Sequence, residues 1–145
     1  MSLTVRDIAK RIARRSADVE IIVGRLRHWT AEGLLSPTGE KNPGTGRSRT
    51  YSESALEDAV ILNALADMGL QIALMRPALT LARHAKAEWR EKAKRGVALF
   101  LEIDTMPNGK RFPHLHESNW FKEDADHALV FNLTQLFARL QARKE

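Results

Sequence analysis

Two amphipathic helices are predicted at the start of the chain. Over residues 4–15, apolar side chains recur at the i, i+3, i+4 and i+7 spacing of one helix face, and Thr4 is a suitable N-cap. Ser16 or Asp18 can cap a second helix that runs to about Glu32. The apolar positions of the two stripes are Val5, Ile8, Ala9, Ile12, Val19, Ile22, Val23, Leu26 and Trp29.

The second helix has one glycine at its end and one in its interior. Gly33 follows its last periodic residue, as expected of a left-handed stop residue. Gly24 lies inside the helix, where glycine costs roughly 1 kcal/mol relative to alanine. This cost suggests that something packs closely against Gly24. The stripe residue Trp29 is expected in the core.

A polar loop follows, with the sequence GEKNPGTGRSRTYS over residues 39–52. It holds three of the chain's eight glycines, and it contains no apolar side chain before Tyr51. It closes on Arg47, Arg49 and Tyr51, each two residues apart. If this end is extended, alternate side chains point the same way, so the three are predicted to share one face of a strand.

The rest of the chain is predicted to hold more helices and then a small sheet. Ser52 is expected to cap a third helix to about Met68, and another helix begins near Gln71. Residues 78–95 are strong helix formers that Gly96 stops.

After Gly96 the periodicity changes to that of short strands. Residues 97–103 and 111–116 are predicted to form a hairpin around the Asn-Gly turn at 108–109. Residues 127–133 fit either a strand or the start of a final helix, and we favour a strand followed by a helix over about 134–143.

Charge is distributed unevenly along the 145 residues. The formal net charge is +5, and residues 1–51 alone hold ten Lys/Arg and five Asp/Glu. A basic N-terminal segment on a near-neutral remainder suggests binding to a polyanion, although an uneven solvated surface gives the same count. The chain has no cysteine, which excludes disulfides, cysteine-based zinc sites and thiol catalysis. No apolar run approaches the ~20 residues of a membrane span, and the charged N-terminus is unlike a signal peptide, so a cytoplasmic protein is expected.

The order of these elements predicts a helix-turn-helix with a wing. The second helix exposes Arg25, Arg27 and His28, which can donate hydrogen bonds in a major groove. The glycine-rich loop offers Arg47 and Arg49 to the phosphates alongside.

Three stretches carry a resemblance to a known family: LTVRDIAKRI, RLRHWTAEGLLSP and GRSRTYSESALEDAVILNALADMGL. Together they resemble the N-terminal winged-helix domain of the MerR, or mercury-resistance regulator, family over about residues 3–75. In that family an arginine and the aromatic after it contact the DNA backbone, as do an arginine and a tyrosine of the wing. The resemblance therefore implies DNA contacts by Arg27, His28, Arg49 and Tyr51, and Arg25 is added from its place on the second helix.

The chain departs from the family pattern in the spacing of its first helices, at His28-Trp29 and in its C-terminal half. The stretch from Ile8 to Gly33 is about six residues longer than the family spacing, and the family commonly has two aromatics at His28-Trp29. Family members typically continue as one long helix that pairs antiparallel with that of a partner. Residues 78–95 could be that helix, and residues 97–145 resemble no effector domain known to us. The candidate pairing seam is Ala78, Ala82, Ala85 and Trp89.

Evidence for catalysis or metal binding is weak in the sequence. His114 and His116 have a strand spacing that metals accept, but no third ligand is evident nearby beyond Glu117 and His127. Solvated or hydrogen-bonded histidines are therefore favoured, with no metal and no cofactor. No catalytic motif is present, so an enzyme is not expected. Trp89 and Trp120 are expected in the core rather than at an interface.

The expected fold is mainly α with small β. It comprises a winged helix-turn-helix DNA-binding domain (1–75), a connecting or dimerisation helix (76–96) and a small α+β region (97–145) made of an antiparallel sheet and a helix. The favoured function is a bacterial transcriptional regulator that binds double-stranded DNA as a homodimer, with a small-molecule or protein effector as a further candidate partner of residues 97–145. The alternatives are an excisionase-like DNA-bending factor of recombination, and a protein- or ligand-binding module that uses the C-terminal sheet.

Overall fold

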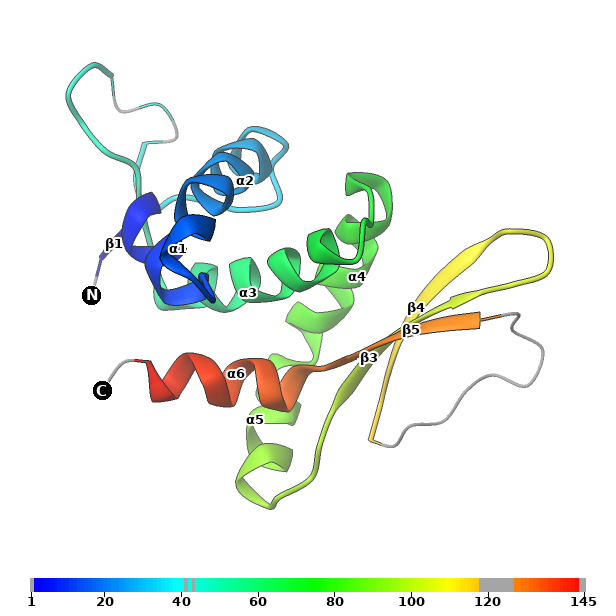
Figure 1. Ribbon diagram of the computed structural model, residues 1–145. Helices are drawn as coiled ribbons and strands as arrows, with labels where there is room; N and C mark the ends of the chain where they lie inside the picture. Colours follow the sequence, from blue (N-terminus) through cyan, green and yellow to red (C-terminus); the bar gives the residue numbers. More distant parts are fainter. Residues whose placement is uncertain (1, 41, 43, 118–126, 144–145) are drawn as a thin grey trace. The chain divides into compact units, whose positions relative to one another are not determined.

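The structure is a computed structural model that describes residues 2–40, 42, 44–117 and 127–143, except for the side chains of Trp89, Ala93 and His127 (Figure 1). Trp120 and the side chain of Trp89 thus lie outside the described residues. The chain forms two compact units, residues 1–63 with 143–145, and residues 64–142. Helices predominate in the described chain and the strands are short, so the predicted mainly α fold with a small β component is confirmed.

Helix α1 (Val5–Ile12) is capped at its N-terminus by Thr4. The Asp7 amide donates to Thr4 Oγ1 at 3.2 Å, and the Thr4 amide donates to Asp7 Oδ2 at 2.9 Å. This capping box satisfies amides at the helix start that have no partner within the helix. On the opposite face Ile8 and Ala9 are fully buried, as their spacing predicted.

Helix α2 (Val19–Ala31) follows a short 3-10 turn, η1 (Ser16–Asp18). Trp29 is buried in the core as predicted, and Gly33 ends the helix with φ +74°. The Leu34 amide donates back to the Trp29 carbonyl at 2.8 Å, which satisfies one of the last carbonyls of the helix. The buried residues of α2 are Ile22, Val23, Leu26, Trp29 and Thr30.

Gly24, inside α2, is exposed. Among the described residues outside its own helix, nothing lies within 4 Å of a Cβ built at this position. The expectation of close packing against Gly24 within the chain is therefore wrong. Its helix cost has no explanation in the packing of the free protein.

The 36–49 loop leaves α2 and returns as the short strand β2 (Thr50–Tyr51). β2 pairs antiparallel with β1 (Leu3–Thr4), which leads directly into α1. The Thr38 amide donates to the Thr50 carbonyl at 2.7 Å, so the loop is closed at its base. The loop and its base can be followed in Figure 1.

The predicted strand face at the end of this loop is wrong. The regular strand covers only Thr50 and Tyr51, so Arg47 and Arg49 precede it. Arg47 is exposed, whereas Tyr51 is buried in the core with 1% of its surface exposed. The alternation of side chains required a strand that starts earlier than the ladder with β1 allows.

Helix α3 (Glu53–Asp67) starts at the predicted cap. The Ala55 amide donates to Ser52 Oγ at 3.2 Å, and the Leu56 amide donates to the Ser52 carbonyl at 3.1 Å. Gly69 follows with φ +76°.

The single helix predicted for residues 78–95 is divided. Helix α4 (Ile72–His84) and helix α5 (Lys86–Lys94) are separated at Ala85. Ala78 and Ala82 of the candidate pairing seam are fully buried, so these two side chains do not form an exposed seam.

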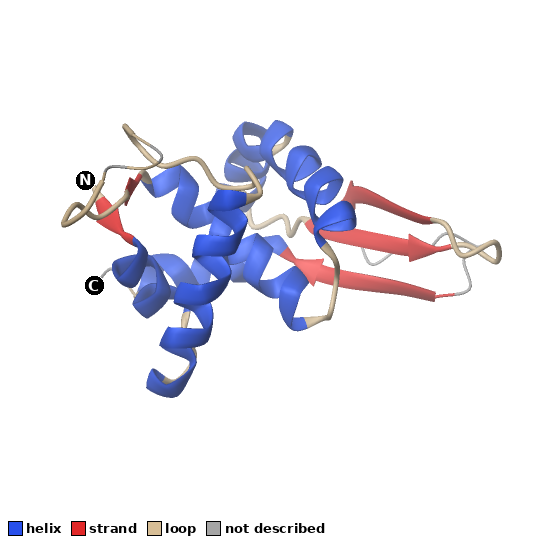
Figure 2. Ribbon diagram, turned by 90° about the horizontal axis from the view of Figure 1, so that it is seen from above, coloured by secondary structure: helices blue, strands red, loops and turns tan. Residues whose placement is uncertain are grey.

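The second unit contains a three-stranded antiparallel sheet followed by a helix, drawn in red and blue in Figure 2. β3 (Phe100–Thr105) lies between β4 (Arg111–His116) and β5 (His127–Asn132), and α6 (Leu133–Ala142) follows β5. The hairpin, the third strand and the final helix are confirmed. The turn at Gly109 has φ +76°, which only glycine adopts without strain.

Both faces of the central strand β3 are buried. Leu101 and Ile103 on one face are at most 1% exposed, as expected for apolar core residues. Glu102 and Asp104 on the other face are equally buried. Two buried carboxylates on one strand are unusual, because ionised groups are seldom fully buried unless they are paired.

Candidate nucleic-acid interface

A hollow of about 580 Å³ on the first unit is bordered by arginines from three segments. Arg6 comes from the first turn of α1, Arg27 from α2, and Arg47 and Arg49 from the 36–49 loop. The β1–β2 pairing explains this meeting, because β1 leads into α1 and β2 follows the loop. We call this site the arginine hollow. Its remaining lining residues are Thr4, Val5, Val23, Gly44 and Ser48.

The arginines of α2 and the loop are accessible at this surface. Arg27 and Arg47 are exposed, and Arg49 is half-buried. Arg49 Nη2 donates to Asn42 Oδ1 at 2.9 Å, a contact within the loop. Guanidinium groups held around one concave surface match the spacing of phosphate oxygens better than isolated charges do.

Arg6 is a member of the arginine hollow that the sequence reasoning missed. It forms an ion pair with Glu20 at 2.5 Å, but the two side chains are 61% and 68% exposed. An ion pair in water at this level of exposure contributes little, so a phosphate can replace Glu20 as the partner of Arg6. The available signal was the basic polar face of the first helix.

The three predicted residues of α2 lie in different environments. Arg27 borders the arginine hollow, whereas Arg25 is half-buried and donates from Nη1 to Asn63 Oδ1 of α3 at 2.8 Å. His28 is exposed and does not line the hollow. The structure therefore brings Arg27, Arg47 and Arg49 together, and it places Arg25 and His28 elsewhere.

Two residues of the exposed α2 surface, Ile21 and Gly24, carry no polar side chain. Ile21 is 60% exposed. Gly24, three residues later, presents no side chain at all. Together they offer a surface to which another molecule can come close.

The side chain of Tyr51 is buried in the core. Its hydroxyl lies 2.8 Å from Thr30 Oγ1, in the core between β2 and α2. Thr30 Oγ1 also donates to the Leu26 carbonyl at 2.8 Å, and a carbonyl can only accept. Thr30 thus uses its one hydroxyl hydrogen in the bond to Leu26, so the Tyr51 hydroxyl is the donor in the hydrogen bond between Tyr51 and Thr30. This bond fastens the base of the 36–49 loop to α2.

A protein-family model matches a large part of the chain. Residues 11–80, just under half of the chain, match the MerR HTH family regulatory protein model. This part of the chain is a MerR-family helix-turn-helix domain. The match confirms the family predicted from the sequence, and it includes α2, the 36–49 loop and α3. It supports a DNA-binding transcriptional regulator in general.

The other comparisons add two observations. No curated protein matches the chain significantly. Among the described residues, none of the helices has the length and apolar character required to cross a membrane.

Proposed function

We propose that the protein is a sequence-specific transcriptional regulator that binds duplex DNA across the arginine hollow. The observation that carries the proposal is the meeting of Arg6, Arg27, Arg47 and Arg49 around one concave surface of a MerR-family domain. Such guanidinium groups bind backbone phosphates and so set the position of the protein on the duplex.

The exposed surface of α2 then supplies the contacts in the groove. With Arg27 and the loop arginines on the phosphates, Ile21, Gly24 and His28 of α2 face the bases of the major groove. An exposed isoleucine suits the methyl group of thymine, and a histidine suits a base acceptor. The absence of a side chain at Gly24 lets the helix come close to the duplex.

The salt dependence of DNA binding tests the phosphate role. Arg49→Ala should weaken binding to all duplex sequences and reduce the slope of log K against log[salt] by about 0.9, the contribution of one phosphate contact. Fluorescence anisotropy with a labelled duplex measures both quantities. Arg111→Ala is the charge-matched control, since Arg111 is an exposed arginine of β4 outside the arginine hollow. An unchanged slope for Arg49→Ala, or an equal change for Arg111→Ala, contradicts the proposal.

The location of bound DNA in cells tests the regulatory role. DNA recovered with the protein from a bacterial cell should map to promoter palindromes, and recovery of recombination attachment sites would instead support a DNA-bending factor. A palindrome requires two copies of the domain, so we also propose a homodimer. Light scattering should then give a mass near twice 16.4 kDa, and a monomer at micromolar concentration contradicts it.

A further inference from the structure

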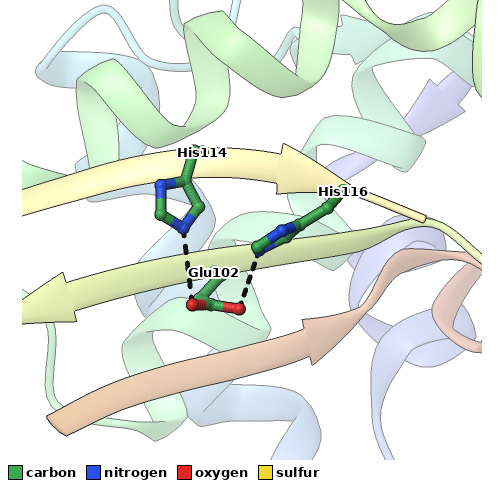
Figure 3. Close-up of side chains that lie close together, drawn as sticks. All are labelled: Glu102, His114 and His116. Atoms are coloured by element: carbon green, nitrogen blue, oxygen red, sulfur yellow. Dashed lines mark ion pairs between the residues drawn. The ribbon is translucent and has the colours of Figure 1, made fainter. Parts of the chain in front are cut away.

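One face of the β3–β4 hairpin carries four side chains of the types that bind metals. Glu102 lies directly opposite His114 in the strand register, and Asp104 and His116 follow two residues later on their strands, on the same face. His114 Nε2 lies 3.4 Å from Glu102 Oε1 and 3.3 Å from Asp104 Oδ2. His116 Nε2 lies 2.7 Å from Glu102 Oε2. Figure 3 shows both imidazoles turned toward the Glu102 carboxylate.

The burial of the Glu102 carboxylate calls for a positive partner. Glu102 is fully buried and Asp104 nearly so. In the described part of the chain, neither oxygen of Glu102 accepts a hydrogen bond of good geometry, and His114 Nε2 makes none. A buried carboxylate is costly unless hydrogen bonds or a cation compensate it, and two of them beside the same imidazole also repel each other.

The spacing of the donor atoms suits a small cation. One ligand atom each from Glu102, His114 and His116 can be chosen so that all lie within 4.8 Å of one another. Ligand atoms around a tetrahedral zinc ion are separated by about 3.4 Å, so small rotations of these side chains bring the three donor atoms to this spacing. The side chains of His114 and His116 are 32% and 15% exposed, which leaves a route of entry for an ion.

We propose that Glu102, His114 and His116 bind a divalent first-row transition ion of the Zn²⁺ type. The two imidazole nitrogens select this class of ion, because Mg²⁺ and Ca²⁺ favour sites made of oxygen ligands. The ion compensates the charge of the buried Glu102 carboxylate, while the histidines bind as neutral imidazoles. The sequence analysis favoured no metal because it sought a third ligand near the histidines in sequence, and the structure supplies it from the neighbouring strand.

The charge of the carboxylates in this cluster can also be balanced in a second way, in which both histidines are protonated and form ion pairs with the carboxylates. That solution has no need of a metal, and the two are distinguished by direct titration. The full-length chain, stripped of metal with a chelator, is titrated with Zn²⁺ in the presence of a chromophoric competitor. The proposal expects one Zn²⁺ per chain and no comparable binding of Mg²⁺ or Ca²⁺ at the same concentrations.

Variants then locate the ion. His114→Ala and His116→Ala should each weaken Zn²⁺ binding at least tenfold. Glu102→Gln keeps the shape of the side chain and should do the same, which covers the case in which a histidine variant fails to fold. His84→Ala is the matched control, because His84 is an exposed histidine of α4 that is not part of the cluster. Zn²⁺ should also shift the imidazole NMR signals of His114 and His116 and leave that of His84 in place.

Three results would overturn the proposal. They are no Zn²⁺ binding by the native chain, equal binding by all the cluster variants, and an equal loss in His84→Ala. None of these measurements contains DNA, so their outcome is independent of the proposed regulatory function.

Discussion

Gly24 offers a test in which the stability of the protein and its DNA affinity should change in opposite directions. The residue lies in the middle of α2, is exposed, and has nothing within 4 Å of an added Cβ among the described residues outside its helix. Gly24→Ala therefore meets no clash in the free protein. Its effect on folding reduces to helix propensity, in which alanine is favoured by about 1 kcal/mol. Urea denaturation followed by circular dichroism should show this gain.

The same methyl group lies on the surface that we assign to the duplex. If α2 approaches the bases closely at this point, the methyl group pushes the helix away, and affinity should fall about tenfold, equivalent to about 1.4 kcal/mol. Fluorescence anisotropy measures the change, with a labelled duplex whose sequence is recovered with the protein from cells. Because the variant is more stable than the native protein, a loss of affinity cannot come from unfolding.

A control separates the local effect from a general one. Thr80→Ala replaces an exposed residue of α4, and it should also stabilise its helix while leaving DNA binding unchanged. Stabilisation by Gly24→Ala with unaltered affinity would refute the placement of this part of α2 on the duplex. A loss of stability would refute the propensity argument itself.

Two further predictions concern Tyr51 and Thr4, which hold the segments around the arginine hollow in place. Tyr51→Phe removes the donor to Thr30 and should destabilise the protein by about 1 kcal/mol in urea denaturation; a weaker DNA affinity with unchanged stability would instead mean that Tyr51 contacts DNA. Thr4→Ala should cost about 1 kcal/mol by loss of the helix cap. The Thr4 side chain, which donates to Asp7, also holds the pKa of that carboxyl below its ordinary value of 3.8. The contribution of this bond is therefore present above pH 3.8 and is lost as the pH falls through the lower pKa of the folded state. NMR titration should show a pKa of Asp7 that is closer to its ordinary value in Thr4→Ala than in the native protein, although the Thr4 amide, Lys10 and Arg11 still lower it, and equal values in the two proteins would contradict the bond.

Local features of the fold could be predicted from the sequence because short-range chemistry determines them. Thr4 and Ser52 cap their helices, Gly33 ends one, and the Asn-Gly turn joins two strands. Each of these depends on a few neighbouring residues that satisfy backbone groups or adopt a left-handed conformation. The predicted family rests on the same short stretches.

Features set by distant contacts could not be predicted. The break at Ala85 lies within a run of strong helix formers, so helix propensity gives no indication of it. Arg6 joins the arginine hollow only through the pairing of β1 with β2. Glu102 belongs to a run that reads as an apolar strand, and its meeting with His114 depends on the register of the hairpin.

The end of the 36–49 loop shows why spacing alone assigns roles poorly. Arg47, Arg49 and Tyr51 have equal spacing in the sequence, yet the first two border a hollow and the third lies in the core. The Tyr51 hydroxyl donates its one hydrogen bond to Thr30 of α2. The base of the loop and the helix are thus held by one bond. Since Arg49 is two residues from this bond and Arg27 three residues from Thr30, Tyr51 can fix the distance between the two arginines without reaching a phosphate. We therefore propose that Tyr51 positions the two arginines, and the Tyr51→Phe variant tests whether it also contacts DNA.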